Sequence, residues 1–195
     1  MIIMKRLILA SASPRREHLL RQIGLRFEIM PSSVNEEIAS SELPIEAVMR
    51  LAMAKANDVY TKVDGARTVM AADTIVVKNS SILGKPENED EAFNMLKFLQ
   101  GGWHEVYSGI AVLDSECELE INDFEVTSVK MTSMDDETIR KYIASGEPLD
   151  KAGSYAIQGR GAVFVERING CYYNVVGLPI FKLFRMLKQC GITVF

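Results

Sequence analysis

The chain has 195 residues, 48% of them hydrophobic, which is enough for one sizeable core and at most two lobes that share it, so we predict a single domain over residues 1–195. The formal net charge of −4 argues against a protein that binds a nucleic-acid backbone, because such proteins carry a basic face. The three cysteines, Cys117, Cys171 and Cys190, form no C-x-x-C pair, which indicates neither a zinc site nor a disulfide framework and is typical of a reducing compartment.

The N-terminal segment predicts a strand followed directly by a helix. "RLILAS" (6–11) is a short apolar run typical of a buried strand; Pro14 suits the first position of a helix with Ser13 as its N-cap, and Gly24 ends that helix. The apolar run is too short for a membrane span, and "SPRR" stands where a signal peptide would have its cleavage region. We therefore expect a soluble, cytoplasmic protein with no membrane partner.

The rest of the chain first alternates predicted strands with predicted helices and then predicts hairpins. The first half is expected to contain a strand at 26–30, a helix at 44–60, a buried central strand at 67–77, and then a loop that starts at 82 and leads into a helix ending at 101–102. The second half is expected to contain strands at 105–114 and 118–131 joined in a hairpin, a helix within 135–148, two strands within 161–179, and a last helix at 179–191. The last hairpin is expected to turn at Asn169-Gly170, a dipeptide that favours tight hairpin turns. This order predicts an α/β fold with a mixed rather than an all-parallel sheet.

Two adjacent arginines, Arg15 and Arg16, stand in the first turn of the first predicted helix. The simplest explanation is that both are solvated. A helix begins at the positive end of its dipole, however, so two cations there are unfavourable unless an anion lies close by. This conflict favours a phosphate-binding site, and the acidic net charge implies that such a site is a focused pocket.

Asp73 is the strongest single indication of chemistry. It lies inside the apolar run "VMAADTIVV", where an ionised carboxylate costs several kcal/mol to bury unless a cation or hydrogen-bond donors meet it. The residue could instead end the strand and cap a turn, but "TIVV" continues the apolar pattern beyond it. We therefore favour a metal-binding or catalytic role for Asp73.

Four further positions are ambiguous on the sequence alone. Lys55 lies on an amphipathic helix among small apolar residues, and Lys85 lies in a Gly-Lys-Pro turn where backbone amides and an ammonium can meet an oxyanion. Glu36 is either a surface acid or, with Asp73, a source of the oxygen ligands that Mg²⁺ or Mn²⁺ prefers. Gln158 belongs to "DKAGSYAIQGRGA", which is either a polar surface loop or a loop shaped to approach a nucleotide.

Other catalytic motifs are missing from the sequence. It has two histidines and no G-x-S-x-G elbow, which argues against a Ser/His/Asp hydrolase. It contains no G-x-x-x-x-G-K-[ST] loop, and no G-x-G-x-x-G follows the first predicted strand, so neither a P-loop nor a dinucleotide site is indicated.

Taken together and in this order, "SASPRR", "LAMAKA", "AADTIV", "GKP", "HEVYSG" and "SGEPLDKAGSYAIQG…NVVGLP" resemble the Maf family of nucleoside triphosphate pyrophosphatases over nearly the whole chain. The resemblance implies an elongated mixed β-sheet with flanking helices and two lobes around a central cleft, related to the fold of the inosine triphosphate pyrophosphatases. It also implies a homodimer and a hydrolase that uses a divalent cation (Mg²⁺, Mn²⁺ or Co²⁺) to cleave a nucleoside triphosphate to the monophosphate and pyrophosphate. The "DKAGSYAIQGRGA" segment is similar to the branch that acts on dTTP and UTP.

The same resemblance implies roles for individual residues. Asp73 would orient or deprotonate the attacking water and, with Glu36, hold the metal. The residues implied to bind the substrate are Ser11, Arg15, Arg16, Lys55 and Lys85, at the triphosphate, and Gln158, at the base.

Two positions depart from the family pattern. Asn35 stands before Glu36 where the family commonly has an aspartate, so one carboxylate near the metal is lost, and Ser108 replaces a threonine, which removes only a methyl group. An alternative from another functional class is a nucleotide-binding regulator of septum formation without turnover. Such a regulator would need the cations but no metal-bound water.

Overall fold

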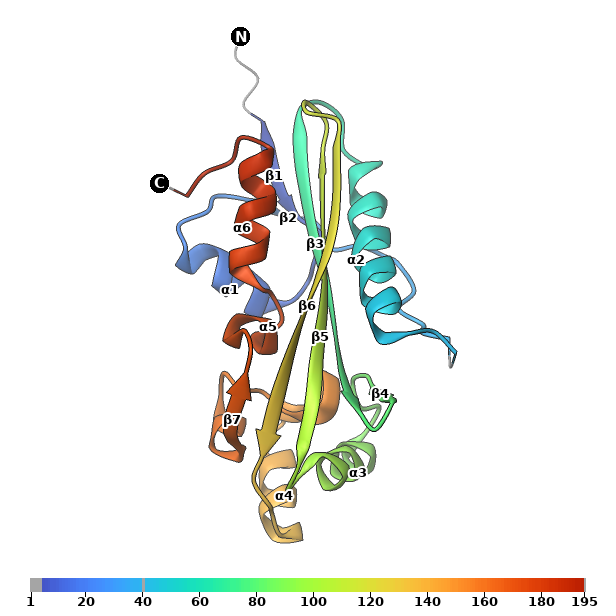
Figure 1. Cartoon of the computed structure of the whole chain (residues 1–195), viewed down its shortest axis with the longest axis vertical. Helices are drawn as coiled ribbons and strands as arrows, with labels where there is room; N and C mark the ends of the chain where they lie inside the picture. The colour runs from blue at the N-terminus through green and yellow to red at the C-terminus, as the bar shows by residue number, and fades with distance from the viewer. Residues whose placement is uncertain (1–4, 40, 195) are drawn as a thin grey trace. The chain divides into compact units, whose positions relative to one another are not determined.

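The computed structural model describes residues 5–39 and 41–194. Seven strands form one mixed sheet in the order β2-β1-β3-β5-β6-β7, and β4 pairs with β3 off this path (Figure 1). Strand β1 (Arg6–Leu9) pairs in parallel with β2 (Glu28–Ile29) and with β3 (Arg67–Lys78), whereas β4 (Ser81–Leu83) runs antiparallel to β3. The predicted mixed α/β sheet with flanking helices is therefore confirmed.

The chain divides into two compact units. The first contains residues up to 73, residues 108–125 and residues from 177 onward; the second contains residues 74–107 and 126–176. The other elements are α1 (Pro14–Gln22), α2 (Pro44–Tyr60), α3 (Glu89–Leu99), β5 (Trp103–Asp114), β6 (Leu119–Met131), α4 (Asp136–Ile143), the 3₁₀ turns η1 (Glu147–Asp150), η2 (Ala152–Ser154) and η3 (Arg160–Phe164), β7 (Val165–Asn169), α5 (Tyr172–Val176) and α6 (Ile180–Gln189). Two lobes were expected, and whether the chain is a single domain stays a prediction.

In the first unit, helix α2 lies on one side of the strands and helices α1 and α6 on the other (Figure 1). The alanines Ala52 and Ala56 of α2 are fully buried in one cluster with Val69 and Ala71 of β3. The strand β5 also approaches α2 closely, because a Cβ atom added at Gly109 would lie 2.1 Å from the carbonyl oxygen of Val48. Small residues thus let a helix pack tightly against the sheet.

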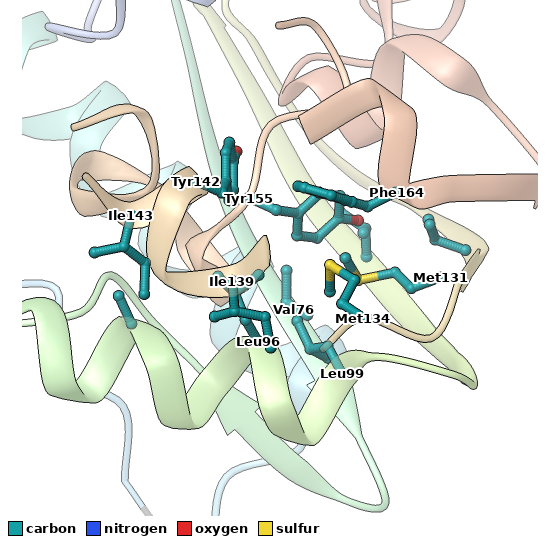
Figure 2. Close-up of a cluster of buried hydrophobic side chains, with 13 residues drawn as sticks. Val76, Leu96, Leu99, Met131, Met134, Ile139, Tyr142, Ile143, Tyr155 and Phe164 are labelled. Atoms are coloured by element: carbon teal, nitrogen blue, oxygen red, sulfur yellow. The ribbon is translucent and has the colours of Figure 1, made fainter. Parts of the chain in front are cut away.

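In the second unit, α3 and α4 pack around an apolar core. Leu96 and Leu99 of α3 face Ile139 of α4, and Val76 of β3 contributes to the same cluster (Figure 2). Caps support both helices: the side chain of Asn88 accepts a bond from the amide of Glu91, and that of Asp135 accepts one from Thr138. The aromatic residues Tyr142, Tyr155 and Phe164 belong to the same cluster (Figure 2).

Most predicted elements are confirmed. The predicted strand at 67–77 is β3, with a nearly continuous buried pattern, and the predicted hairpin at 105–131 is the adjacent pair β5 and β6. The predicted strand at 26–30 is reduced to the two residues of β2. The prediction that Ser13 is the N-cap residue of α1 is confirmed, and its side chain makes no capping hydrogen bond.

The predicted hairpin turn at Asn169-Gly170 is wrong. Strand β7 ends at Asn169 and is followed by helix α5. The amide of Cys171 donates to Oγ1 of Thr127 in β6 at 3.0 Å, and that hydroxyl donates to the carbonyl oxygen of Cys171 at 3.1 Å. A Cβ at Gly170 would lie 2.9 Å from the same Oγ1 atom, so the glycine serves a close approach to β6 rather than a two-strand turn.

Among the described residues, no helix combines the length and the apolar character that crossing a bilayer requires.

Candidate active site

The carboxylate of Asp73 lies in the interior of β3 and is nearly fully buried, as the sequence pattern predicts. Its Oδ1 atom accepts a hydrogen bond from Nζ of Lys55 at 2.5 Å. Lys55 is also buried, because it lies on the face of α2 that packs against β3, between Ala52 and Ala56. The small neighbours leave room for a lysine on a helix face that would otherwise be apolar. The two buried charges compensate each other, which makes this burial tolerable.

The same ammonium group binds a second carboxylate. Nζ of Lys55 lies 2.7 Å from Oε1 of Glu36, whose side chain is half exposed. Lys55 therefore bridges two carboxylates from segments far apart in the sequence. The guanidinium of Arg16 also interacts electrostatically with both carboxylates, so Lys55 and Arg16 together balance their negative charge.

Arg16 and Ser11 form a second polar group in the same unit. Nε of Arg16 donates to the carbonyl oxygen of Gly177 at 2.8 Å, and its Nη1 donates to Oγ of Ser11 at 3.2 Å. Burial lowers the pKa of Arg16, and the charge of Arg15 acts in the same direction, whereas Asp73 and Glu36 raise it. A guanidinium remains protonated in proteins, so Arg16 is a fixed cation with a defined orientation.

Arg15 lies in the first turn of α1, next to Arg16, and is half buried. The helix begins with Pro14, and its first turn contains one acidic residue, Glu17. Two cations at the positive end of a helix dipole make this terminus attractive to an anion. The structure thus places Ser11, Arg15 and Arg16 at one helix start, as the phosphate-site hypothesis requires.

Two predicted substrate-binding residues belong to the second unit. Lys85 is exposed in the turn after β4, and Gln158 is exposed in the loop between η2 and η3. The amide of Gly153 donates to the carbonyl oxygen of Gly84 at 3.0 Å, which ties the Gly-Lys-Pro turn to the segment that leads to Gln158. A side chain at Gly153 would collide with Val76 at 3.0 Å, so the glycine permits this contact.

The family model for Maf-like proteins matches residues 6–190. The chain belongs to the Maf-like protein family. Among its curated relatives, the dTTP/UTP pyrophosphatase of Caldicellulosiruptor bescii is 51% identical over 191 residues, covering 96% of each chain. The dTTP/UTP pyrophosphatase of Alkaliphilus oremlandii is 51% identical over 186 residues, covering 95% of this chain and 96% of the relative.

Solved structures give a weaker likeness to this Maf-like protein. A HAM1 protein from Coxiella burnetii aligns with a TM-score of 0.42 and 16% identity, covering 66% of this chain and 73% of that chain.

The donor set of the Maf-like protein fits a hard divalent cation that is shared with a substrate. Within the described ranges, no group of three or more His, Cys, Asp or Glu residues is arranged to hold a metal. Glu36 and Asp73, both within reach of Lys55, are the two carboxylates at this place. Mg²⁺ is commonly held by one or two carboxylates, with water and substrate phosphates as the other ligands. The residues present therefore fit such an ion, provided that the ion replaces one of the contacts that Lys55 makes with the two carboxylates.

Of the two positions expected to depart from the family pattern, Asn35 makes a local contact that the structure shows, and Ser108 is buried. Oδ1 of Asn35 accepts a hydrogen bond from the amide of Glu37 at 3.2 Å, so Asn35 shapes the turn that carries Glu36. Ser108 is fully buried in β5. The contacts of Lys55 with Asp73 and Glu36 are present with these two residues in place.

One contact of the site was not foreseen from the sequence. The carbonyl oxygen of Gly177 orients the Arg16 guanidinium across 161 positions of the chain. A backbone acceptor leaves no side-chain pattern, so no sequence signal could have shown it.

Proposed function

We propose that this Maf-like protein hydrolyses nucleoside triphosphates, with dTTP and UTP as its substrates, to the monophosphate and pyrophosphate with the help of a divalent cation. The observation that carries the proposal is the buried Lys55 ammonium between Asp73 and Glu36, in the unit that also holds Arg16 and Ser11. The names of the curated relatives support the substrate pair. No observation favours a regulator without turnover.

Asp73 is the residue that we assign to the attacking water. Lys55 donates a hydrogen bond to Oδ1 of Asp73. We assign Oδ2 to the water, whose proton it accepts as the water oxygen bonds to the α-phosphorus. The bond from the α-phosphorus to the bridging oxygen breaks at the same time, and pyrophosphate leaves with that oxygen. General-base assistance of this kind contributes typically about 10²–10⁴ in rate.

The cationic residues would bind the triphosphate and offset its charge. Arg15 and Arg16 are assigned to the phosphates because they lie at the start of α1, where the helix dipole adds to their attraction. Lys55 and Lys85 are assigned further phosphate contacts, and Gln158 the base, on the family resemblance. A bound divalent cation would lower the pKa of the water that it holds and neutralise phosphate charge.

The proposal is tested by supplying purified protein with dTTP, UTP, CTP, dATP and GTP, each with Mg²⁺, Mn²⁺ or Co²⁺, and measuring pyrophosphate release. Turnover of dTTP and UTP above the others, and only with a divalent cation, is the expected result. Nucleotide binding without pyrophosphate release from any of them would contradict the proposal and support the regulator.

The position of the attack is tested separately in water enriched in ¹⁸O. Attack at the α-phosphorus places the label in the monophosphate, and attack at the β-phosphorus places it in pyrophosphate. Label in pyrophosphate would overturn the assignment of the bond that breaks. The proposed homodimer is checked by light scattering on the same preparation, where a monomeric mass would refute it.

A further inference from the structure

We infer that Glu147 and Tyr142 are positioning residues that hold the loop around Gln158 and thereby set the selectivity for the base. The inference rests on the proposed function, because Gln158 is assigned to the base there. Glu147 begins the turn η1 and Tyr142 lies near the end of α4. Both belong to the second unit, as does the loop.

The carboxylate of Glu147 binds the backbone just after Gln158. Its Oε2 accepts a hydrogen bond from the amide of Arg160 at 2.9 Å, and its Oε1 accepts one from the amide of Gly161 at 3.0 Å. Oε1 also accepts the hydroxyl of Tyr142 at 2.8 Å. Burial raises the pKa of Glu147, but these hydrogen bonds together outweigh it and leave the pKa below its ordinary value, so the carboxylate is ionised at neutral pH.

The hydroxyl of Tyr142 binds the backbone just before Gln158. It accepts a hydrogen bond from the amide of Ala156 at 3.1 Å while it donates to Glu147. The ring itself is fixed, because it packs edge to face against Phe164 with 5.1 Å between the ring centroids (Figure 2). The side chains of Tyr142 and Glu147 therefore bind the backbone on both sides of the exposed Gln158.

Two glycines in "QGRG" provide independent support for this arrangement. A Cβ atom at Gly159 would lie 2.5 Å from Oε2 of Glu147, and a Cβ at Gly161 would lie 2.6 Å from the hydroxyl oxygen of Tyr142. Both distances are far below van der Waals contact. The backbone thus approaches these two polar groups as closely as it does because no side chain stands between them.

The structure contains a matched control pair. The hydroxyl of Tyr107 donates to Oε2 of Glu105 at 2.7 Å, in the same unit. This is the same kind of bond as that between Tyr142 and Glu147, but both partners lie on strand β5 and the bond holds no loop. Tyr107→Phe therefore removes an equivalent hydrogen bond without releasing the Gln158 segment.

The test compares Glu147→Gln and Tyr142→Phe with Tyr107→Phe. The amide of a glutamine offers one acceptor oxygen where the carboxylate has two, and a phenylalanine keeps the ring packing but loses the hydroxyl. For both loop variants we expect the KM for UTP to rise about tenfold with kcat changed less than about threefold, and the preference for UTP over ATP to fall. Tyr107→Phe should keep the wild-type KM and preference.

Hydrogen exchange gives a readout that needs no activity. The amides of Ala156, Arg160 and Gly161 should exchange faster in the variants that remove their acceptors and at the wild-type rate in Tyr107→Phe. Variants that hydrolyse UTP with unchanged KM and unchanged preference would overturn the inference and leave the proposed function standing. A wild-type protein that hydrolyses no nucleotide would refute the proposed function. The inference would then be tested by the ratio of the dissociation constants for UTP and ATP, and a ratio that is the same in the loop variants as in the wild type would overturn it.

Discussion

Replacing Lys55 by methionine removes the cation between Asp73 and Glu36 and keeps an unbranched side chain that is one atom shorter. The side chains of Lys55 and Asp73 are 6% and 7% exposed, so the variant leaves a buried carboxylate without its cation. Breaking a buried pair in this way typically costs about 3–5 kcal/mol. Arg16 still attracts Asp73, and the half-exposed Glu36 regains water, so we expect the lower end of the range, about 3 kcal/mol.

Urea denaturation of a double-mutant cycle measures this coupling. Lys55→Met combined with Asp73→Asn should cost less than the sum of the single variants, by about 2 kcal/mol, because the uncompensated charge is gone. Lys62→Met is the matched control: it breaks the more exposed pair of Lys62, which lies just beyond the end of α2, with Asp58 of that helix, and should cost less than about 1 kcal/mol. Additive costs for the Lys55 and Asp73 variants would refute the view that the two residues form one compensated pair.

Further predictions concern titration, packing and metal dependence. Burial, aided by the charge of Lys78, lowers the pKa of His104 to about 4. Between about pH 6.5 and 4 the unfolded chain therefore binds a proton that the folded protein does not, so the contribution of His104 to stability is lost as the pH falls through that window. A titration midpoint above about pH 6 for its ring, measured by NMR, would contradict this. Gly109→Ala should lower the free energy of unfolding, measured in urea, by about 3 kcal/mol or more, because the new Cβ collides with the backbone of α2. Gly84→Ala, with no atom within 4 Å of its Cβ, should lower it little. Equal costs would show that the strand and the helix are not so closely packed. EDTA should abolish pyrophosphate release, and added Mg²⁺ or Mn²⁺ should restore it. The variant Glu36→Gln should require a higher metal concentration for the same activity. Activity that survives EDTA would exclude the proposed cation.

Some of the site is visible in the sequence because it breaks a local rule. Asp73 interrupts an apolar strand, which predicts a compensated burial that the structure shows. Lys55 interrupts a row of small residues on a helix, but on the sequence alone it is ambiguous. Arg15 and Arg16 oppose a helix dipole, which predicts an anion at the start of α1. Each of these signals is a conflict that can be recognised within a few residues of sequence.

Other parts depend on contacts that no local pattern encodes. Glu147 reaches backbone amides 13 and 14 positions away, and those donors have no sequence signature. At Asn169-Gly170 the local preference for a hairpin is overridden by the hydrogen bonds of Thr127 with Cys171. Tertiary contacts decide such segments, and the sequence predicts them only where glycines, as at 159 and 161, mark a close approach.

The central claim is that Asp73 activates the water in a site that binds a nucleoside triphosphate. Its most direct test is to measure kcat for UTP hydrolysis and the dissociation constant of UTP for the wild type, Asp73→Asn and the surface control Asp58→Asn. The account predicts that Asp73→Asn loses about 10²–10⁴ in kcat and still binds UTP, while Asp58→Asn matches the wild type in both. Wild-type kcat in Asp73→Asn would contradict it.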